Sequence, residues 1–426
     1  METKMGLEQQ EIINLSNDLQ EPSWLQQLRL QALNNIEKLP LPKPDKTKID
    51  KWNFSSIKLD MGKKADSLSG KVKTLISEEI NQNLIIINKN NVIQTIQAED
   101  LTSKGVIIKN LHDAVKENED LVKKHLGSIF KSEQHKLSAL HYSHLNSGLF
   151  IYVPKNVVIE NAIQVVFVQN DGESLFNHVL LVADQHSSIT YIENLVSNSN
   201  QVEEVASTYV TEVVVGDGAN VTYAAIDTLA KGNVAYVSRR ANVGRDAKML
   251  WANGVMNDSN TIIENDTYLI GDGAFGDTKI VTIGNGNQIQ NFTTKTIHTG
   301  KRTEGFILKH GVALEESTSI FNGIGKIEHG ASKSDAEQTS RVLMLSKKAR
   351  GDANPMLLID ENDVKAGHAA SVGRIDELQM YYLMSRGISR KEAERLIILG
   401  FLAPVIEAIP VETVKKQFLN VIERKL

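Results

Sequence analysis

The sequence predicts a mainly β protein, built as a parallel β-solenoid between a helical beginning and a helical end. Two observations carry this prediction. From residue 148 onward, short runs of β-branched and aromatic residues alternate with Gly, Asn and Asp over about half of the chain. A turn followed by a small residue and a strand also recurs, as in VGDGANVTYAAID at 215 and VGRDAKMLWANGV at 243.

The spacing of this repeat indicates stacked coils. Ala219, Ala247 and Ala274 occupy the same place in successive repeats, 28 and 27 residues apart. A period of that length holds two or three strands, so each coil can stack on its neighbour and share a continuous core. Only 5% of the residues are aromatic, which suits a narrow interior filled by Val, Ile, Leu and Ala. A two-sheet sandwich is the competing fold at this point.

The region before residue 145 is expected to be helical and mixed. The segment EPSWLQQLRLQALNNIEKL predicts a helix with Ser23 as its N-terminal cap, and the prolines between Pro40 and Pro44 end it. NLIIINKNNVIQTI, at 83–96, predicts a β-hairpin, and HDAVKENEDLVKKHL, at 112–126, predicts a second helix.

The last part of the chain is expected to form three helices. DELQMYYLMSRG ends at Gly387, a residue type that often follows a helix. Ser389 and Glu392 form a capping-box pair at the start of the next helix, and VETVKKQFLNVIERKL has one apolar side. Such helices either cap a solenoid or offer a docking surface. The predicted regions are an N-terminal helical and mixed region, a parallel β-helix core and a C-terminal segment with a helical domain, at residues 1–145, 146–360 and 361–426.

The composition excludes several classes of function. A net charge of -5 and a pI near 6.2 give no basic field that would attract nucleic acid or an anionic membrane. No apolar run approaches the roughly 18 residues that a spanning helix needs. The polar beginning METKMGLEQQEIINLSNDLQ does not resemble a signal peptide, so we expect a cytoplasmic protein. The chain has no cysteine, so any thiolate must come from another molecule.

Two motif matches do not support a site. Gly271, Gly273 and Gly276 match Gly-x-Gly-x-x-Gly, but the strand-like DTKIVTIG follows where a dinucleotide site needs a helix. His141 and His144 have the i, i+3 spacing of paired metal ligands, yet no third ligand follows at a convincing spacing. No Gly-x-x-x-x-Gly-Lys-Ser/Thr motif occurs, so the chain is not itself a P-loop ATPase.

A series of motifs carries a resemblance to a known family. DVKAGHAASVG, at 363–373, sets His368 among small residues, and LMSRGISRKEA begins at Leu383. EPSWLQQLRLQALNNIEKLPLP and GLFIYVPKNVVIE, at 148–160, extend the match over nearly the whole chain. In these elements the chain resembles the SufB/SufD family of iron–sulfur cluster assembly proteins. The other matching positions are Ser334, Asp335, Arg341, Ser346, Pro355, Val372, Gly373 and Asp376.

The resemblance implies a right-handed parallel β-helix and a non-catalytic scaffold subunit. The partners it implies are a SufB-like subunit, which carries the sulfur-accepting cysteine, and a SufC-like ATPase, whose ATP hydrolysis remodels the pair where a cluster forms. No cofactor is then expected to stay bound to this chain alone. Transient iron or a nascent iron–sulfur cluster would be shared with the SufB-like subunit.

The resemblance also points to two sets of residues. Many related sequences have Cys-Ser-His where this chain has Ala366, Gly367 and His368, which leaves His368 as the expected iron ligand. A hydrogen bond across a subunit contact is the alternative role for this imidazole. The C-terminal helices are expected to bind the SufC-like ATPase, since Tyr, Met and Arg are favoured at interfaces. The residues expected in that contact are Tyr381, Tyr382, Met384, Arg386, Glu392, Leu396 and Phe401.

A rival function and an oligomeric state are also considered. A β-helix enzyme acting on polysaccharide is the rival function, although the chain lacks the signal peptide and the aromatic-rich β region that it would need. Without its partners, the chain is expected to form a homodimer through the surface meant for the SufB-like subunit.

Overall fold

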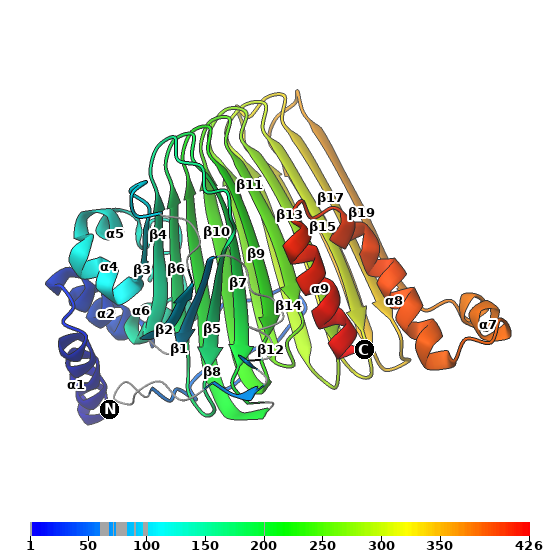
Figure 1. Cartoon of the computed structure of the whole chain (residues 1–426), viewed down its shortest axis with the longest axis horizontal. Helices are drawn as coiled ribbons and strands as arrows, with labels where there is room; N and C mark the ends of the chain where they lie inside the picture. Colours follow the sequence, from blue (N-terminus) through cyan, green and yellow to red (C-terminus); the bar gives the residue numbers. More distant parts are fainter. Residues whose placement is uncertain are drawn as a thin grey trace.

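The computed structural model shows a long solenoid of β-strands with helices at both ends (Figure 1). It describes residues 2–59, 68–70, 72–73, 83–88, 91–96, 101–199 and 201–426. In the solenoid, strands that follow one another in the chain enter two different sheets, so each coil contributes one strand to each sheet. Equivalent strands of successive coils pair in parallel. The predicted solenoid is confirmed, and the sandwich alternative is wrong.

The two sheets, which we call sheet A and sheet B, run along the whole solenoid. Sheet A is completed at its first edge by an antiparallel hairpin, β1–β2, and sheet B by an antiparallel strand, β3. In spatial order, sheet A consists of β19 (Lys365–Arg374), β17 (Asp335–Met344), β15 (Glu304–Ala313), β13 (Phe275–Gly284), β11 (Lys248–Val255), β9 (Asn220–Thr228), β7 (Ser188–Ser197), β5 (Ile163–Gln169), β1 (Asn83–Asn88) and β2 (Asn91–Ile96). Sheet B consists of β18 (Arg350–Ile359), β16 (Thr318–Ile327), β14 (Ile289–His298), β12 (Asn260–Leu269), β10 (Lys231–Val243), β8 (Gln201–Val215), β6 (Phe176–Ala183), β4 (Ser147–Val153) and β3 (Ile107–Asn110).

One edge of the solenoid is a ladder of left-handed turns, and these turns are the repeat found in the sequence. Gly218, Asp246 and Gly273 hold the same place in successive coils, with φ of 68°, 53° and 69°. Each donates its backbone N–H to the next coil, as Gly218 does to the carbonyl of Arg245 at 2.8 Å. The small residue that follows, such as Ala219, is fully buried. The Gly-x-Gly-x-x-Gly match is therefore part of a turn that leads into β13, as predicted.

The interior of the solenoid, which we call the lumen, is filled by side chains from both sheets. Strand register arranges these side chains in rows with one residue per coil. In one row of sheet A, Tyr191, Tyr223 and Trp251 stack with ring centroids 4.8 and 5.0 Å apart. The same row ends in two polar residues, Gln338 on β17 and His368 on β19. The lumen thus becomes polar toward its C-terminal end.

Helices of the N-terminal region cover the first strands of sheet B on its outer face (Figure 1). Leu111 and Phe130 are fully buried in the apolar cluster that joins them to the sheet. Glu212 on β8 holds a loop of this region, because its carboxylate accepts the backbone N–H groups of Gly127 and Ile129 at 2.7 and 2.6 Å. The helices are α1 (Glu2–Asp18), α2 (Ser23–Asn35), α4 (Leu111–Glu117), α5 (Glu119–His125) and α6 (Lys136–His144).

Two local predictions in this region need correction. Ser23 is the first residue of α2 and makes no capping hydrogen bond, since the cap position belongs to Pro22. The helix predicted at 112–126 is broken at Asn118, whose φ of -131° ends α4 and starts α5. The predicted hairpin is confirmed as β1 and β2, although its two turn residues lie outside the described residues.

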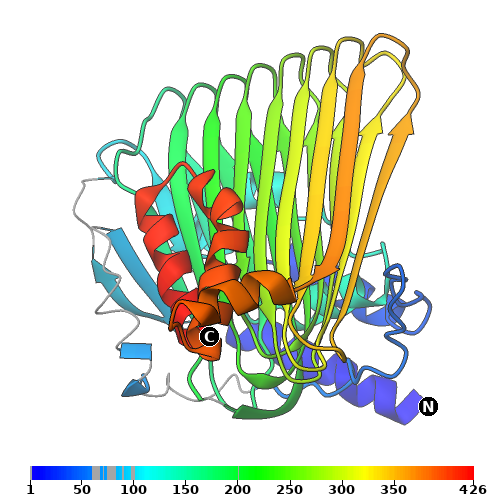
Figure 2. The same cartoon turned by 90° about the vertical axis from the view of Figure 1, so that its right-hand side faces the viewer.

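The three predicted C-terminal helices are present as α7 (Glu377–Ser385), α8 (Arg390–Glu407) and α9 (Glu412–Lys425). Helices α8 and α9 lie against the outer face of sheet A, whereas α7 projects away from the solenoid (Figures 1 and 2). Leu402 of α8 and Phe418 of α9 are buried in the apolar cluster between helices and sheet. Gly254 on β11 has no side chain, which leaves room for the ring of Phe418.

The two ends of the solenoid differ. At its start, α4 and the β1–β2 hairpin pack against the first coil. At its C-terminal end, β18 and β19 are the outermost described strands of their sheets and most of their residues are at least partly exposed. Strand β4 begins at Ser147, and strand β19 begins after residue 360. The division of the chain into three regions at residues 145 and 360 stays a prediction. No helix among the described residues is long and apolar enough to cross a membrane.

Candidate functional site

The open C-terminal end of the solenoid is the first candidate site. Strands β18 and β19 each pair on one side only within the described residues, with β16 and β17. Their other edges therefore present unpaired backbone N–H and C=O groups. Several apolar side chains are exposed beside these edges, with Met356, Leu358 and Val372 at 38%, 48% and 41%. An exposed edge with apolar side chains is a template for pairing with another chain.

His368 lies within this open end. It pairs with Gln338 of β17 and so continues the lumen row of stacked aromatic residues. Gln338 is only 4% exposed, and its Nε2 donates to the carbonyl of Met356 across the lumen at 2.8 Å. His368 is exposed, because no described coil covers it and its neighbours on the same face of β19, Ala366 and Ala370, are small. The imidazole is accessible to a molecule that docks on this end.

One imidazole is an incomplete metal site. Neutral His is a good ligand for iron, and it supplies a single coordination position. The described residues contain no group of three or more His, Cys, Asp or Glu side chains that could hold a metal ion. The sequence contains no cysteine. Within the described part of the chain, His368 thus offers one ligand and no second side chain of these types completes a metal site beside it.

Helix α7 is the second candidate site, because the solenoid leaves its apolar side chains uncovered. Asp376 caps the helix by accepting the N–H of Leu378 at 2.8 Å, and Gly387, with φ of 87°, follows its end as predicted. Of the nine residues of α7, only Met380 is buried. Leu378 and Tyr381 are 74% and 71% exposed. They help to line an apolar groove formed by Leu378, Gln379, Tyr381, Tyr382, Leu383, Ser385 and Ile397.

Five of the seven residues predicted to contact a partner are exposed. Tyr381, Tyr382 and Met384 lie on α7, and Leu396 lies on α8. The guanidinium of Arg386 lies 5.2 Å from the centroid of the Tyr382 ring, within the range of a cation–π contact. The structure therefore brings the four residues of the α7 region together on one short exposed segment.

The other two predicted contact residues have partners within the chain. Glu392 pairs with Arg395 at 3.1 Å, and its N–H bonds to Ser389 Oγ, which is half of the predicted capping box. The ring of Phe401 stacks on His310 of β15 at 4.8 Å, and its carbonyl oxygen lies 2.6 Å from His310 Nδ1. Both residues thus help to build the C-terminal helices, and their contact with a partner stays a prediction.

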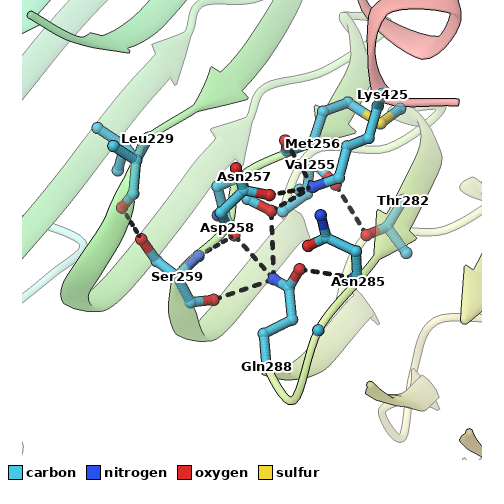
Figure 3. A network of polar contacts seen from close by, with 12 residues as sticks. Leu229, Val255, Met256, Asn257, Asp258, Ser259, Thr282, Asn285, Gln288 and Lys425 are labelled. Atoms are coloured by element: carbon cyan, nitrogen blue, oxygen red, sulfur yellow. Dashed lines mark hydrogen bonds and ion pairs between the residues drawn. The ribbon is translucent and has the colours of Figure 1, made fainter. Parts of the chain in front are cut away.

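Lys425 fastens α9 to the solenoid (Figure 3). Its Nζ donates to the carbonyls of Met256 and Asn257 at 2.9 and 2.5 Å, and it pairs with Asp258 at 2.9 Å. Gln288 holds the same turn from below, with its Nε2 3.2 Å from the carbonyl of Asn257. Burial lowers the pKa of Lys425, and the nearby Asp258 opposes that shift.

The variant Lys425→Met is expected to loosen α9. It removes the ammonium donor and leaves two backbone carbonyls without it, and hydrogen bonds to a charged group contribute about 1.5–3 kcal/mol each. We expect a lower melting temperature and faster chymotrypsin cleavage within the C-terminal helices. Lys416→Met, on an exposed position of the same helix, is the matched control. Equal cleavage of the two variants would contradict the role of Lys425.

Sequence reasoning did not single out Gln338 or Lys425. Gln338 lies 30 residues before His368, close to one coil of the solenoid, so counting one period back from the histidine is the signal that finds it. Lys425 has no such signal, since most of its acceptors are backbone carbonyls, which the sequence does not distinguish.

The histidines at 141 and 144 do not converge. His141 lies between Thr208 and His178, with 3.0 Å between its Nε2 and Nδ1 of His178. His144 instead contacts the backbone carbonyl of Leu140 at 3.2 Å. Burial lowers the pKa of His141 well below its usual value. These imidazoles are part of the buried contact between α6 and sheet B.

Two models of known protein families match the chain. The SufBD protein N-terminal region matches residues 16–165. The SufBD core domain of the SUF system for FeS cluster assembly matches residues 166–401, more than half of the chain. The chain belongs to the SufBD family. Membership of the SufBD family confirms the resemblance that the motifs indicated.

Relatives within the SufBD family match over almost their full length. The iron–sulfur cluster assembly protein SufD of Bacillus subtilis is 52% identical over 433 residues, covering 100% of this chain and 99% of the relative. Iron–sulfur cluster assembly SufBD family proteins of Staphylococcus saprophyticus and Staphylococcus aureus are 26% and 27% identical, covering 96% of this chain and 91% of each relative.

Proposed function

We propose that this chain is a non-catalytic scaffold subunit in iron–sulfur cluster assembly, which pairs with a SufB-like subunit and carries a SufC-like ATPase. The observation that carries the proposal is the open end of the solenoid, where an exposed His368 lies among unpaired strand edges and apolar side chains. The family description, FeS cluster assembly, and the name of the Bacillus subtilis relative support it.

The SufB-like partner is assigned to the open end. Backbone groups along β18 and β19 offer hydrogen bonds to a further strand, and Leu358 and Val372 offer apolar area beside them. A second solenoid with a similar end continues both sheets, which is the geometry of strand addition. When that partner is absent, a second copy of this chain occupies the same end, so we expect the isolated chain to be a homodimer.

Iron or a nascent cluster is the cargo at the interface between this chain and the SufB-like subunit. His368 contributes an imidazole from the row that lines the lumen, and the SufB-like subunit contributes the remaining ligands, including the thiolate that this chain lacks. No cofactor is expected to stay on the isolated chain, since a single ligand holds iron weakly. The location that we propose for this work is the cytoplasm.

The SufC-like ATPase is assigned to α7. Its exposed Leu378, Tyr381 and Tyr382 form an apolar surface that a partner can cover. Helix α8 contacts His310 of sheet A, and Lys425 fixes α9 to the connection that follows β11. Because β15, which carries His310, pairs with β17 and β17 pairs with β19, a displacement of the helices by the ATPase reaches the strand of His368.

The rival function, an enzyme acting on polysaccharide, is opposed by the family to which the chain belongs. A reducing-sugar release assay separates the two functions. Robust turnover of a polysaccharide by the isolated chain would overturn the scaffold proposal.

The pairing is tested by charges placed on the open end. The double variant Leu358→Asp, Val372→Asp is expected to weaken binding to the SufB-like subunit by at least about a hundredfold, since buried unpaired carboxylates oppose docking. The same variant should convert the isolated homodimer to a monomer in light scattering. Val158→Asp, at an exposed position near the start of the solenoid, is the control. Unchanged pairing in the double variant would exclude the open end as the interface.

A further inference from the structure

The two strands at the open end differ in the backbone N–H groups that they leave free. Along a strand inside a sheet, alternate residues direct their N–H groups to opposite neighbours. In β18, the N–H of Arg350 donates to the carbonyl of Ser317 at 3.0 Å, and the N–H of Asp360 donates to the carbonyl of Ile327 at 2.9 Å. The register with β16 is unbroken between these two bonds. The even-numbered residues of β18 therefore bond to β16, and the odd-numbered residues face the open edge.

Pro355 is one of the residues that face the open edge of β18. It lies in the middle of the strand, in register with Gly323 of β16. Proline has no N–H, and its ring occupies the space that the acceptor of a partner strand would need. Proline on an edge strand is a common protection against pairing with another chain. The other residues that face this edge are Gly351 and Ala353 before the proline and Leu357 and Ile359 after it.

Strand β19 has no such gap. The N–H of Lys365 donates to the carbonyl of Ser334 at 2.9 Å, and the N–H of Ile375 donates to the carbonyl of Met344 at 3.1 Å. The register with β17 is unbroken between them, so the even-numbered residues of β19 face the open edge. Each of these residues has an N–H group, and the row they form is continuous. Its members are Ala366, His368, Ala370, Val372 and Arg374.

The side chains of sheet B are closed at this end as well. On its outer face, Asn354 Nδ2 donates to Asn322 Oδ1 at 2.9 Å, and Asn322 Nδ2 donates to Asn291 Oδ1 at 3.1 Å. Each Oδ1 thus accepts the amide of the next coil. At the last coil, Nζ of Lys46 takes the place of that amide, 2.5 Å from Asn354 Oδ1. The asparagine ladder therefore ends within this chain, on a lysine that follows Pro44 in the connector.

We propose that β19 is the strand that forms backbone hydrogen bonds with a strand of the SufB-like partner, and that β18 meets this partner through side chains. The inference rests on the proposed pairing at the open end and narrows the strand addition assigned there to both sheets. The unbroken N–H row of β19 fits the carbonyls of an extended strand. A strand added to β18 would bury a carbonyl without a donor opposite Pro355. Because His368 belongs to the row, the partner strand runs beside its imidazole.

Hydrogen exchange resolved to single amides tests the proposal on the wild-type protein. On assembly with the SufB-like subunit, we expect exchange of the outward-facing amides of β19 to slow by at least about tenfold, and that of the outward-facing amides of β18 to change by less than about twofold. Equal protection of both strands would overturn this inference and keep the open end as the interface. Protection of neither strand would overturn the inference together with the pairing on which it rests.

A matched pair of proline variants gives a second test. Ala370→Pro on β19 and Ala353→Pro on β18 each remove one outward-facing N–H and no ladder bond within the chain. We expect Ala370→Pro to weaken binding of the SufB-like subunit by at least about tenfold, and Ala353→Pro to change it by less than about twofold. Melting temperatures check the fold of both variants, and the exchange experiment needs neither of them. An equal loss of affinity in the two variants would overturn the proposal.

Discussion

Replacement of His368 by alanine is expected to remove most of the iron from the complex reconstituted with the SufB-like and SufC-like subunits. The imidazole is exposed at the end of a lumen row and packs against no further coil, so its loss leaves the fold unchanged. If it is a ligand, one coordination position is lost, and we expect roughly a tenfold decrease in iron and sulfide per complex. Both are measured after anaerobic reconstitution, on complexes shown by size to be fully assembled.

Two further variants make this test specific. His368→Cys restores a ligand of another kind at the same place and should recover part of the iron, which a purely structural histidine would not predict. His329→Ala removes an exposed histidine from a nearby turn and should leave the iron content unchanged. A wild-type iron content in an intact His368→Ala complex would show that His368 is not an iron ligand. It would favour a hydrogen-bonding role for this residue at the interface.

Charges on α7 are expected to abolish binding of the SufC-like ATPase. Leu378 and Tyr381 are the most exposed large side chains of the helix, and they line one groove. In the double variant Leu378→Asp, Tyr381→Asp, docking would bury two carboxylates without partners. We expect the affinity to fall by at least about a hundredfold, measured by calorimetric titration. Iron incorporation should fall with it, because the ATPase is no longer recruited.

The melting temperature is the control for folding in this variant. Neither side chain contributes to the buried core, so substitution of these surface residues should change stability little. Leu419→Asp, on an exposed position of α9, adds charge to the same group of helices and should bind the ATPase normally. If the α7 variant binds the ATPase with wild-type affinity, the ATPase does not contact this part of α7. Glu392 and Leu396 of α8 would then be the next positions to test.

Several features of the fold could be predicted because they depend on local sequence. The turn ladder needs a residue that tolerates positive φ, followed by a small residue that fits the interior, and Gly218-Ala219 and Gly273-Ala274 meet both needs within two positions. The repeat of that pattern at one coil length predicted the solenoid. The ends of the C-terminal helices were predictable for the same reason, since Gly387 and Ser389 act on their immediate neighbours.

The candidate site was predictable only in part. The family resemblance indicated His368, and the preference of interfaces for Tyr, Met and Arg indicated the tyrosines of α7; all three residues proved exposed. Neither signal showed that Phe401 stacks on His310, since these residues lie 91 positions apart and meet only when α8 packs on sheet A. The sequence likewise did not separate the exposed part of the predicted ATPase contact from the part that supports the helices.

The sequence by itself thus determined the solenoid, its helical ends and its family. Only the tertiary structure decided which side chains face the lumen, because a shift of one residue in strand register turns every side chain to the opposite face. Because His368 pairs in register with Gln338, it lies at the open C-terminal end of the lumen. Because Lys309 pairs in register with Ile280 and Ser340, its side chain is buried inside the lumen. Each of these pairings joins residues about one coil apart, and their chemistry arises only when the coils stack.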